Sequence, residues 1–281
     1  MIPARRATTE STPQAPQPMK SRYLALVPII LIALFLIPMA LLRNEVVRRP
    51  EPPVTPPAIS EKVLPPPLPY TTASPSVDGI GKIFMDREIA KVMGHPGIGW
   101  LERTEREKEE APSKAIAMLD LAPDTVIADI GAGSGYYSFR MAGLVPNGKV
   151  VAVDIQQEML DYLKDEAARR RIGNVEPHLG AVDSIKVAPD TLDAVLMVDA
   201  YHEFSHPVEM LQSIRSALKP GGRIHLLEYR GEDPRVPIKP LHKMTEEQAI
   251  REFEALGFAF VGNKRGLPWQ HHLVFEKPRH P

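Results

Sequence analysis

Short runs of continuous apolar residues alternate with amphipathic segments through most of the chain after residue 110. The apolar runs predict strands at residues 126–130, 150–155, 175–179, 192–198 and 223–229. Apolar residues at helical spacing predict helices that begin near residue 113 and cover residues 156–168 and 207–218. Strands without a polar face are typical of parallel sheets with helices on both sides. The pattern therefore predicts a doubly wound α/β domain.

The C-terminal part of this domain is expected to end differently. Thr245 and Gln248 form a capping box for a helix that stops at Gly257. Two further apolar runs, residues 258–264 and 270–277, have no helix between them and predict a closing hairpin. The expected architecture is a mainly parallel, seven-stranded sheet with one antiparallel strand.

An uncharged, mostly apolar stretch at residues 23–42 stands apart from the rest of the chain. Its length is that of a bilayer-spanning helix, and Pro28 and Pro38 are tolerated better in a membrane helix than in a soluble one. A cleavable signal peptide is the alternative, but no clear cleavage site precedes Arg43. We expect an uncleaved single membrane anchor that follows a polar tail, residues 1–22.

Residues 43–77 are rich in proline. Such a segment is extended and stiff where it adopts polyproline II, and we interpret it as a spacer before a globular domain at residues 78–281. Basic residues stand on both sides of the anchor, so the positive-inside rule does not fix its orientation. The side of the membrane on which the domain lies stays open.

The composition excludes several classes of function. The formal net charge is −1, so the charge balance gives no reason to expect nucleic acid as a partner. The chain has no cysteine, which excludes disulfides, cysteine nucleophiles and thiolate zinc sites. His271 and His272 are adjacent, but neighbouring residues on a strand point to opposite faces. We expect one of them to face solvent, and we predict no metal site.

The first strand runs into a glycine-rich turn that has acids before and beyond it. Asp129 lies inside the strand, and Gly131, Gly133 and Gly135 follow. Glycine lets a backbone turn sharply and approach a ligand closely. The second strand ends at Asp154, about 20 residues further on, where an acid can accept hydrogen bonds from two ribose hydroxyls. The pattern predicts a site for a nucleoside cofactor.

The spacing of the glycines separates two cofactor classes. A dinucleotide fingerprint needs a glycine where this chain has Tyr136, and Asp129 would repel a diphosphate. Residues 126–138 instead resemble motif I of the class I S-adenosylmethionine-dependent methyltransferases, and the Leu-Lys-Pro-Gly-Gly run at 218–222 resembles a second hallmark of that family. Segments such as Tyr-His-Glu-Phe at 201–204 look similar to a group of bacterial predicted methyltransferases.

The resemblance implies a Rossmann-like methyltransferase fold and S-adenosylmethionine as the cofactor. It implies a cofactor site made of Asp129, Gly131, Ala132, Gly133, Ser134, Gly135, Asp154, Ile155, Gln156, Asp183 and Asp199. The loop would hold the amino acid part of the cofactor, Asp154 the ribose, and Ile155 and Gln156 would flank the adenine. The family's usual acid after the third strand is displaced here to Asp183, so backbone groups are the alternative contact for the adenine amino group.

Catalytic groups are expected beyond the carboxyl ends of the fourth and fifth strands, where ligands bind in open α/β sheets. His202 is the predicted general base, because its reference pKa lies near neutrality. Glu203 would orient it or bind substrate, and Tyr201 would shape the pocket. The end of the fifth strand and the following segment predict either a basic rim for an anionic substrate or a solvated loop: Glu228, Tyr229, Arg230, Lys239, His242 and Lys243.

Residues 87–93 and 99–110 precede the first strand and are predicted to form two helices. In methyltransferases of this type, such helices commonly cover the cofactor, which would place Trp100 and Arg103 in a lid. The alternative, which we favour, packs Trp100 in the core and leaves residues 106–110 as a solvated face.

These features predict a membrane-anchored S-adenosylmethionine-dependent methyltransferase that acts on a small-molecule or lipid-soluble substrate. A nicotinamide-dependent oxidoreductase is the first alternative, and Tyr136 counts against it. A non-catalytic binding module that retains the fold is the second. The fold does not fix the substrate.

Overall fold

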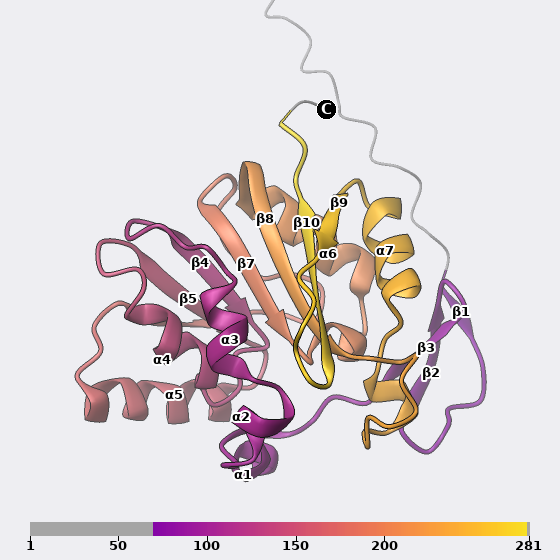
Figure 1. The fold of residues 1–281 in the computed structure, drawn as a ribbon. Helices are drawn as coiled ribbons and strands as arrows, with labels where there is room; N and C mark the ends of the chain where they lie inside the picture. The colour runs from indigo at the N-terminus through magenta and orange to yellow at the C-terminus, as the bar shows by residue number, and fades with distance from the viewer. Residues whose placement is uncertain (1–69, 280–281) are drawn as a thin grey trace, which may run out of the picture. The chain divides into compact units, whose positions relative to one another are not determined.

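The computed structural model describes residues 70–279 (Figure 1). The predicted tail (1–22), membrane span (23–42) and most of the proline-rich linker lie outside the described residues. Within residues 70–279, no helix combines the length and the hydropathy that a bilayer crossing requires.

Seven strands form one sheet in the order β6-β5-β4-β7-β8-β10-β9. They are β4 (Val126–Ile130), β5 (Lys149–Asp154), β6 (Val175–Leu179), β7 (Leu192–Val198), β8 (Leu218–Tyr229), β9 (Ala259–Asn263) and β10 (Gln270–Glu276). Strands β4 to β8 pair in parallel, and β10 pairs antiparallel with both β8 and β9. Of these seven strands, only β10 runs antiparallel to the others. The described residues therefore confirm the predicted seven-stranded, mainly parallel sheet.

Helices cover both faces of this sheet (Figure 1). One face carries α3 (Pro112–Ala117), α4 (Tyr136–Ala142) and α5 (Gln157–Arg170), and the other carries α6 (Pro207–Ala217) and α7 (Glu246–Ala255). Two short helices, α1 (Ile98–Leu101) and α2 (Arg106–Glu109), lie beyond the carboxyl ends of the strands. Residues 70–279 also contain three 3₁₀ turns: η1 (His95–Gly97), η2 (Tyr201–Glu203) and η3 (Pro240–His242).

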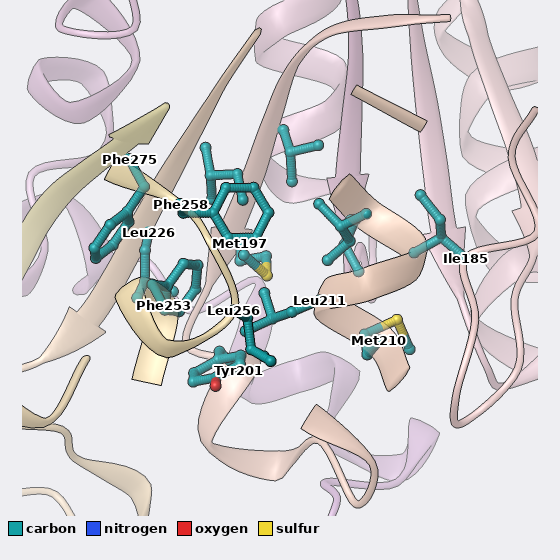
Figure 2. Close-up of a cluster of buried hydrophobic side chains, with 14 of the residues drawn as sticks. Ile185, Met197, Tyr201, Met210, Leu211, Leu226, Phe253, Leu256, Phe258 and Phe275 are labelled. Atoms are coloured by element: carbon teal, nitrogen blue, oxygen red, sulfur yellow. The ribbon is translucent and has the colours of Figure 1, made fainter. Parts of the chain in front are cut away.

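Alternate residues of the central strands pack on opposite faces, because successive side chains of a strand point to opposite sides. In β4, Ile127 packs in the cluster that contains α3, α4 and α5, whereas Ala128 and Ile130 pack in the cluster that contains α6 and α7. Figure 2 shows part of the second cluster, in which the rings of Phe253 and Phe275 stack with centroids 4.3 Å apart. Burial on both faces explains why the central strands lack a polar face.

The segment before α1 differs from the prediction. It forms a separate three-stranded sheet of β1 (Thr71–Thr72), β2 (Gly79–Phe84) and β3 (Arg87–Ala90). Residues 87–93, predicted as a helix, therefore begin as a strand. Met85 and Asp86 both have positive φ and form the tight turn between β2 and β3. Such turns favour glycine or asparagine, so this Met-Asp pair gives no turn signal in the sequence.

The predicted boundary between linker and domain also needs correction. The sequence predicts residues 70–77 as part of the linker, but β1 pairs with β2, and the Tyr70 hydroxyl donates to Glu209 Oε2 at 2.6 Å. The same hydroxyl accepts a hydrogen bond from the Val208 N–H at 3.0 Å. Because these contacts tie the segment to α6, the folded domain includes Tyr70 and does not start at residue 78.

His271 and His272 are both buried, so the expectation that one of them faces solvent is wrong. They lie on β10, which is an interior strand between β8 and β9. His272 Nε2 lies 2.9 Å from His225 Nδ1, and His271 Nε2 lies 2.9 Å from Glu232 Oε2. The two side chains do point to different surroundings, as strand alternation requires.

Candidate active site

A cavity of about 650 Å³ lies beyond the carboxyl ends of the parallel strands. This volume is in the range of small-molecule sites. Its glycine end is formed by Gly131, Gly133, Asp154, Ile155 and Gln156. Its histidine end is formed by His202, Glu203 and His242. Both sets of residues line one continuous space, so a ligand at one end can reach a ligand at the other.

The loop after β4 favours glycine because of its backbone conformation and its close approach to neighbouring segments. Gly131 and Gly133 have φ of +73° and +53°, in the left-handed region. A Cβ atom on Gly131 would lie 2.7 Å from the Ala200 Cβ, and one on Gly133 would lie 2.7 Å from the Leu101 Cδ1. The two glycines therefore let α1 and the segment after β7 close over the loop.

Asp154 ends β5, and backbone groups fix its carboxylate. Oδ2 accepts a hydrogen bond from the Gly133 N–H, and Oδ1 accepts one from the Gln156 N–H, both at 2.9 Å. Burial raises the pKa of Asp154, and these N–H groups act in the opposite direction. A carboxylate offers about four lone-pair sites, so the oriented group can still accept hydroxyl donors from the cavity.

A strap of residues 93–95 crosses the glycine end. The Gln156 side chain holds it, donating from Nε2 to the Met93 carbonyl at 3.0 Å and accepting the His95 N–H at Oε1 at 2.8 Å. Ile155 is 38% exposed and lines the cavity, so it offers an apolar surface to a ring.

The predicted cofactor residues fall into two groups. Those that line the cavity are Gly131, Gly133, Asp154, Ile155, Gln156 and Asp199. Those that do not line it are Asp129, Ala132, Ser134, Gly135 and Asp183. Asp129 lies behind the loop, where its Oδ2 accepts the Ser138 hydroxyl at 2.6 Å and burial raises its pKa to about 6. Its observed contact is with α4, which corrects the prediction that it lines the methionine end.

Asp183 is exposed and stands outside the cavity wall, which contains Ala181 and Val182 instead. Of the two alternatives for the adenine contact, backbone groups of this segment are therefore better placed than the Asp183 carboxylate.

Asp199 follows β7 and carries an unsatisfied oxygen. Its Oδ2 accepts from Gln270 Nε2 at 2.7 Å, whereas its buried Oδ1 has no hydrogen-bond partner in the described chain. Burial, together with the negative charges of Glu110 and Glu228, raises the pKa of Asp199 well above its usual range. An ammonium group in the cavity would both satisfy this oxygen and stabilise its ionised form.

At the histidine end, η2 places the His202 ring against β8. His202 Nδ1 lies 2.7 Å from Glu228 Oε2, and both side chains are buried. Burial lowers the pKa of His202, but the Glu228 carboxylate outweighs it and raises the pKa above its usual range. The other ring nitrogen, Nε2, lies 3.1 Å from His242 Nδ1 on η3.

Glu203 completes the histidine end. Its Oε2 accepts the Met93 N–H at 3.1 Å, which turns Oε1 toward the two imidazoles. Oε1 lies 3.8 Å from His202 Nε2 and 3.5 Å from His242 Nδ1. The sequence gives no signal that His242 meets His202, because the two residues lie 40 positions apart in separate segments.

Tyr201 does not belong to the cavity wall, in contrast to its predicted role. Its hydroxyl donates to Glu252 at 2.7 Å, and its ring packs in the core beside Phe253 (Figure 2).

The predicted basic rim is only partly present. Lys239 lines the cavity but pairs with Asp78 at 2.5 Å, so its charge is offset.

Helices α1 and α2 cover the cavity. Trp100 lines it and is 47% exposed, with the Arg103 guanidinium 3.7 Å from the ring centroid. Arg106 and Glu110 are buried and paired at 2.7 Å, and the Tyr229 hydroxyl donates to Glu110 at 2.7 Å. The favoured interpretation, with Trp100 in the core and a solvated 106–110 face, is therefore wrong.

Comparison with known proteins identifies the class. The sequence profile of the methyltransferase domain family matches residues 121–269, more than half of the chain. The protein belongs to this family, the class I S-adenosylmethionine-dependent methyltransferases. A crystal structure of such a methyltransferase from Aquifex aeolicus superposes with a TM-score of 0.63 at 21% identity, covering 66% of this chain and all of that one. The superposition supports the fold.

Curated relatives match over shorter stretches. An uncharacterized methyltransferase-like protein of Schizosaccharomyces pombe is 31% identical over 40% of this chain and 41% of its own length. A ubiquinone/menaquinone biosynthesis C-methyltransferase of Pseudomonas putida is 29% identical over 48% of this chain and 49% of its own. The matched region thus spans less than half the length of these relatives.

The glycine end fits S-adenosylmethionine better than a dinucleotide. The unsatisfied Asp199 oxygen suits the ammonium group of the cofactor, and Asp154 suits a ribose diol. The Ser134 hydroxyl, at the start of α4, donates to Glu102 at 2.5 Å. A negatively charged carboxylate this close to the loop would repel the diphosphate of a dinucleotide bound there.

Proposed function

We propose that this protein transfers a methyl group from S-adenosylmethionine to a small-molecule acceptor bound at the histidine end. The observation that carries the proposal is the single cavity that joins Asp154 and His202. Methyl transfer needs the acceptor atom in line with the methyl group, and a continuous cavity lets the protein hold both reactants in that geometry.

The glycine end would bind the cofactor. The loop at Gly131 and Gly133 would hold its amino acid part, with Asp199 facing the ammonium group. Asp154 would accept the ribose hydroxyls, and Ile155 would pack on the adenine. When bound, the cofactor supplies an electrophilic methyl group on a sulfonium.

The histidine end would bind and activate the acceptor. Glu228 fixes the His202 ring and its tautomer, so that Nε2 faces the cavity. Two large apolar side chains of the wall that are not assigned to the cofactor, Val92 and Trp100, are exposed, which favours an acceptor with apolar parts. The relative named for ubiquinone/menaquinone biosynthesis is compatible with such an acceptor.

We further propose that residues 23–42 anchor the protein in a membrane and that the proline-rich segment holds the domain away from its surface. The support is the apolar stretch itself, long enough to span a bilayer. An anchored domain would meet lipid-soluble acceptors near the bilayer.

Calorimetric titration of S-adenosylmethionine into the purified full chain tests the proposed activity at its first step. We expect saturable binding that Asp154→Ala weakens at least about 100-fold, since two hydrogen bonds to a charged acceptor are lost at about 1.5–3 kcal/mol each. Asp165→Ala, the same change on the exposed face of α5, serves as the matched control and should leave the affinity unchanged.

Two results would overturn the proposal. One is the absence of cofactor binding by a chain that circular dichroism shows to be folded. The other is displacement of the cofactor by NAD at comparable concentration, which would favour the oxidoreductase alternative.

A further inference from the structure

The histidine end carries an arrangement that the sequence did not predict. Two imidazole nitrogens and one carboxylate oxygen converge there from η2 and η3: His202 Nε2, His242 Nδ1 and Glu203 Oε1. Their separations are 3.1, 3.5 and 3.8 Å. Side chains of this kind, brought this close and facing a cavity, are the donor set of a transition-metal site.

We propose that His202, His242 and Glu203 bind a divalent transition-metal ion, and that this ion activates the acceptor. Metal–nitrogen and metal–oxygen bonds of about 2.1 Å place neighbouring ligand atoms about 3.0–3.4 Å apart in octahedral or tetrahedral geometry. Two of the three separations lie within about 0.1 Å of this range, and the His202–Glu203 pair needs to close by a few tenths of an ångström.

The groups behind the ligands have the pattern of an outer shell. His202 keeps its second nitrogen on the Glu228 carboxylate at 2.7 Å, the contact that orients metal-bound histidines in proteins. Glu203 keeps its second oxygen on the Met93 N–H at 3.1 Å. Two of the three ligands are therefore held in place from the side that faces away from the proposed ion.

The donor types select the kind of ion. Imidazole nitrogens suit zinc, iron, nickel and copper, whereas magnesium and calcium prefer oxygen ligands. Three protein ligands leave coordination positions open toward the cavity that Gly131 and Asp154 also line. The open positions would face the reacting methyl group rather than bulk protein.

The proposed metal site indicates the chemical class of the acceptor, and this part of the inference rests on the proposed methyl transfer. A hydroxyl or enol oxygen on the ion would release its proton to solvent, as water does on catalytic zinc. The oxygen lone pair would then form the bond to the methyl carbon while the carbon–sulfur bond breaks and its electron pair stays on sulfur. His202 would hold the ion instead of acting as the predicted general base.

Cobalt titration of the full chain, stripped of metal by a chelator, tests the proposal. Co²⁺ gives visible absorption bands whose intensity reports its coordination geometry, so the readout does not depend on a known acceptor. We expect saturation at one ion per chain. His242→Ala and Glu203→Gln, both at partly exposed positions, should each weaken Co²⁺ binding at least about 100-fold. Loss of an outer-shell partner alone can weaken metal binding by up to about 100-fold, and the loss of a direct ligand should weaken it at least as much.

The matched control is His95→Ala, an exposed histidine in the strap beside the cavity, which should bind Co²⁺ like the wild type. Absence of ligand-field bands in the wild type, or equal binding by all four proteins, would overturn the metal proposal.

S-adenosylmethionine titration of the same samples separates the two proposals. Cofactor binding without Co²⁺ binding overturns only the metal site. The reverse result overturns the proposed methyl transfer, and with it the role of the ion in activating the acceptor, but leaves the metal site itself standing.

Discussion

The two ends of the cavity are built by different means. At the glycine end the key contacts are made by backbone: N–H groups of residues 133 and 156 hold Asp154, and missing side chains at Gly131 and Gly133 make room. At the histidine end the contacts are between side chains, with Glu228 behind His202 and Glu203 beside His242.

This difference has a consequence for each end. Backbone contacts depend on the turn between β4 and α4 and the end of β5, so they tolerate a change of neighbouring side chains. Side-chain contacts depend on the identity of each residue and on the packing of three separate loops. We therefore expect the glycine end to fix a common cofactor and the histidine end to fix the particular acceptor.

The cover over both ends is tied together by the buried Glu110 carboxylate, which pairs with Arg106 at 2.7 Å and with Arg103 at 2.5 Å, and removing it should give the largest loss of stability. Glu110→Ala leaves Arg106 buried without its carboxylate, which costs about 3–5 kcal/mol of unfolding free energy. Urea unfolding measures the change. Glu105→Ala, at an exposed acid of the same segment, should change it by less than about 0.5 kcal/mol. Equal effects of the two variants would show that the cover is not anchored through Glu110.

A side chain added to the loop should damage the glycine end specifically. Gly131→Ala places a Cβ 2.7 Å from Ala200 at a φ of +73°, so cofactor affinity should fall about 10–100-fold, or about 1.4–2.8 kcal/mol. Gly173→Ala adds the same atom where nothing lies within 4 Å and should bind the cofactor normally. If Gly131→Ala also weakens Co²⁺ binding by the same factor, the two ends are not separately built.

The fold should lose stability at acid pH, which limits the pH range in which these variants can be compared. Burial lowers the pKa of His225 to about 3 and that of His272 to about 4, so both stay neutral in the fold. Below an unfolded-state pKa of about 6.5, the unfolded chain takes up protons that the folded chain does not. Stability should then fall by up to about 1.4 kcal/mol per pH unit for each imidazole.

Urea unfolding of the wild type and His272→Gln between about pH 7 and pH 5 measures this slope, which the substitution should reduce. His202, whose pKa is raised, contributes with the opposite sign in both proteins and cancels in the difference. A slope that does not change would show that His272 does not contribute to the acid sensitivity of the fold.

What could be predicted from the sequence follows the same division. The strand, turn and strand that present Gly131, Gly133 and Asp154 are contiguous, so local pattern was enough to place them. The order of helices and strands likewise predicted the sheet and its antiparallel strand. Asp129 was misplaced because a residue inside a strand can face either the ligand or the packing behind the loop.

The histidine end could not be assembled from local pattern. His202, Glu228, His242 and Met93 come from separate segments, and only packing shows that they meet. The strand β3 and the buried Arg106–Glu110 pair were missed for a related reason. A hairpin turn without glycine and charged residues that pair in the interior both look like exposed helix in a sequence.

The central claim is that one cavity holds a cofactor at its glycine end and an ion-bound acceptor at its histidine end. Crossed titration of Asp154→Ala and His242→Ala with S-adenosylmethionine and Co²⁺ tests it most directly. We predict that Asp154→Ala loses cofactor affinity and keeps Co²⁺, whereas His242→Ala loses Co²⁺ and keeps the cofactor. The claim would be contradicted if each folded variant lost affinity for both ligands. It would also be contradicted if neither variant lost affinity for either ligand.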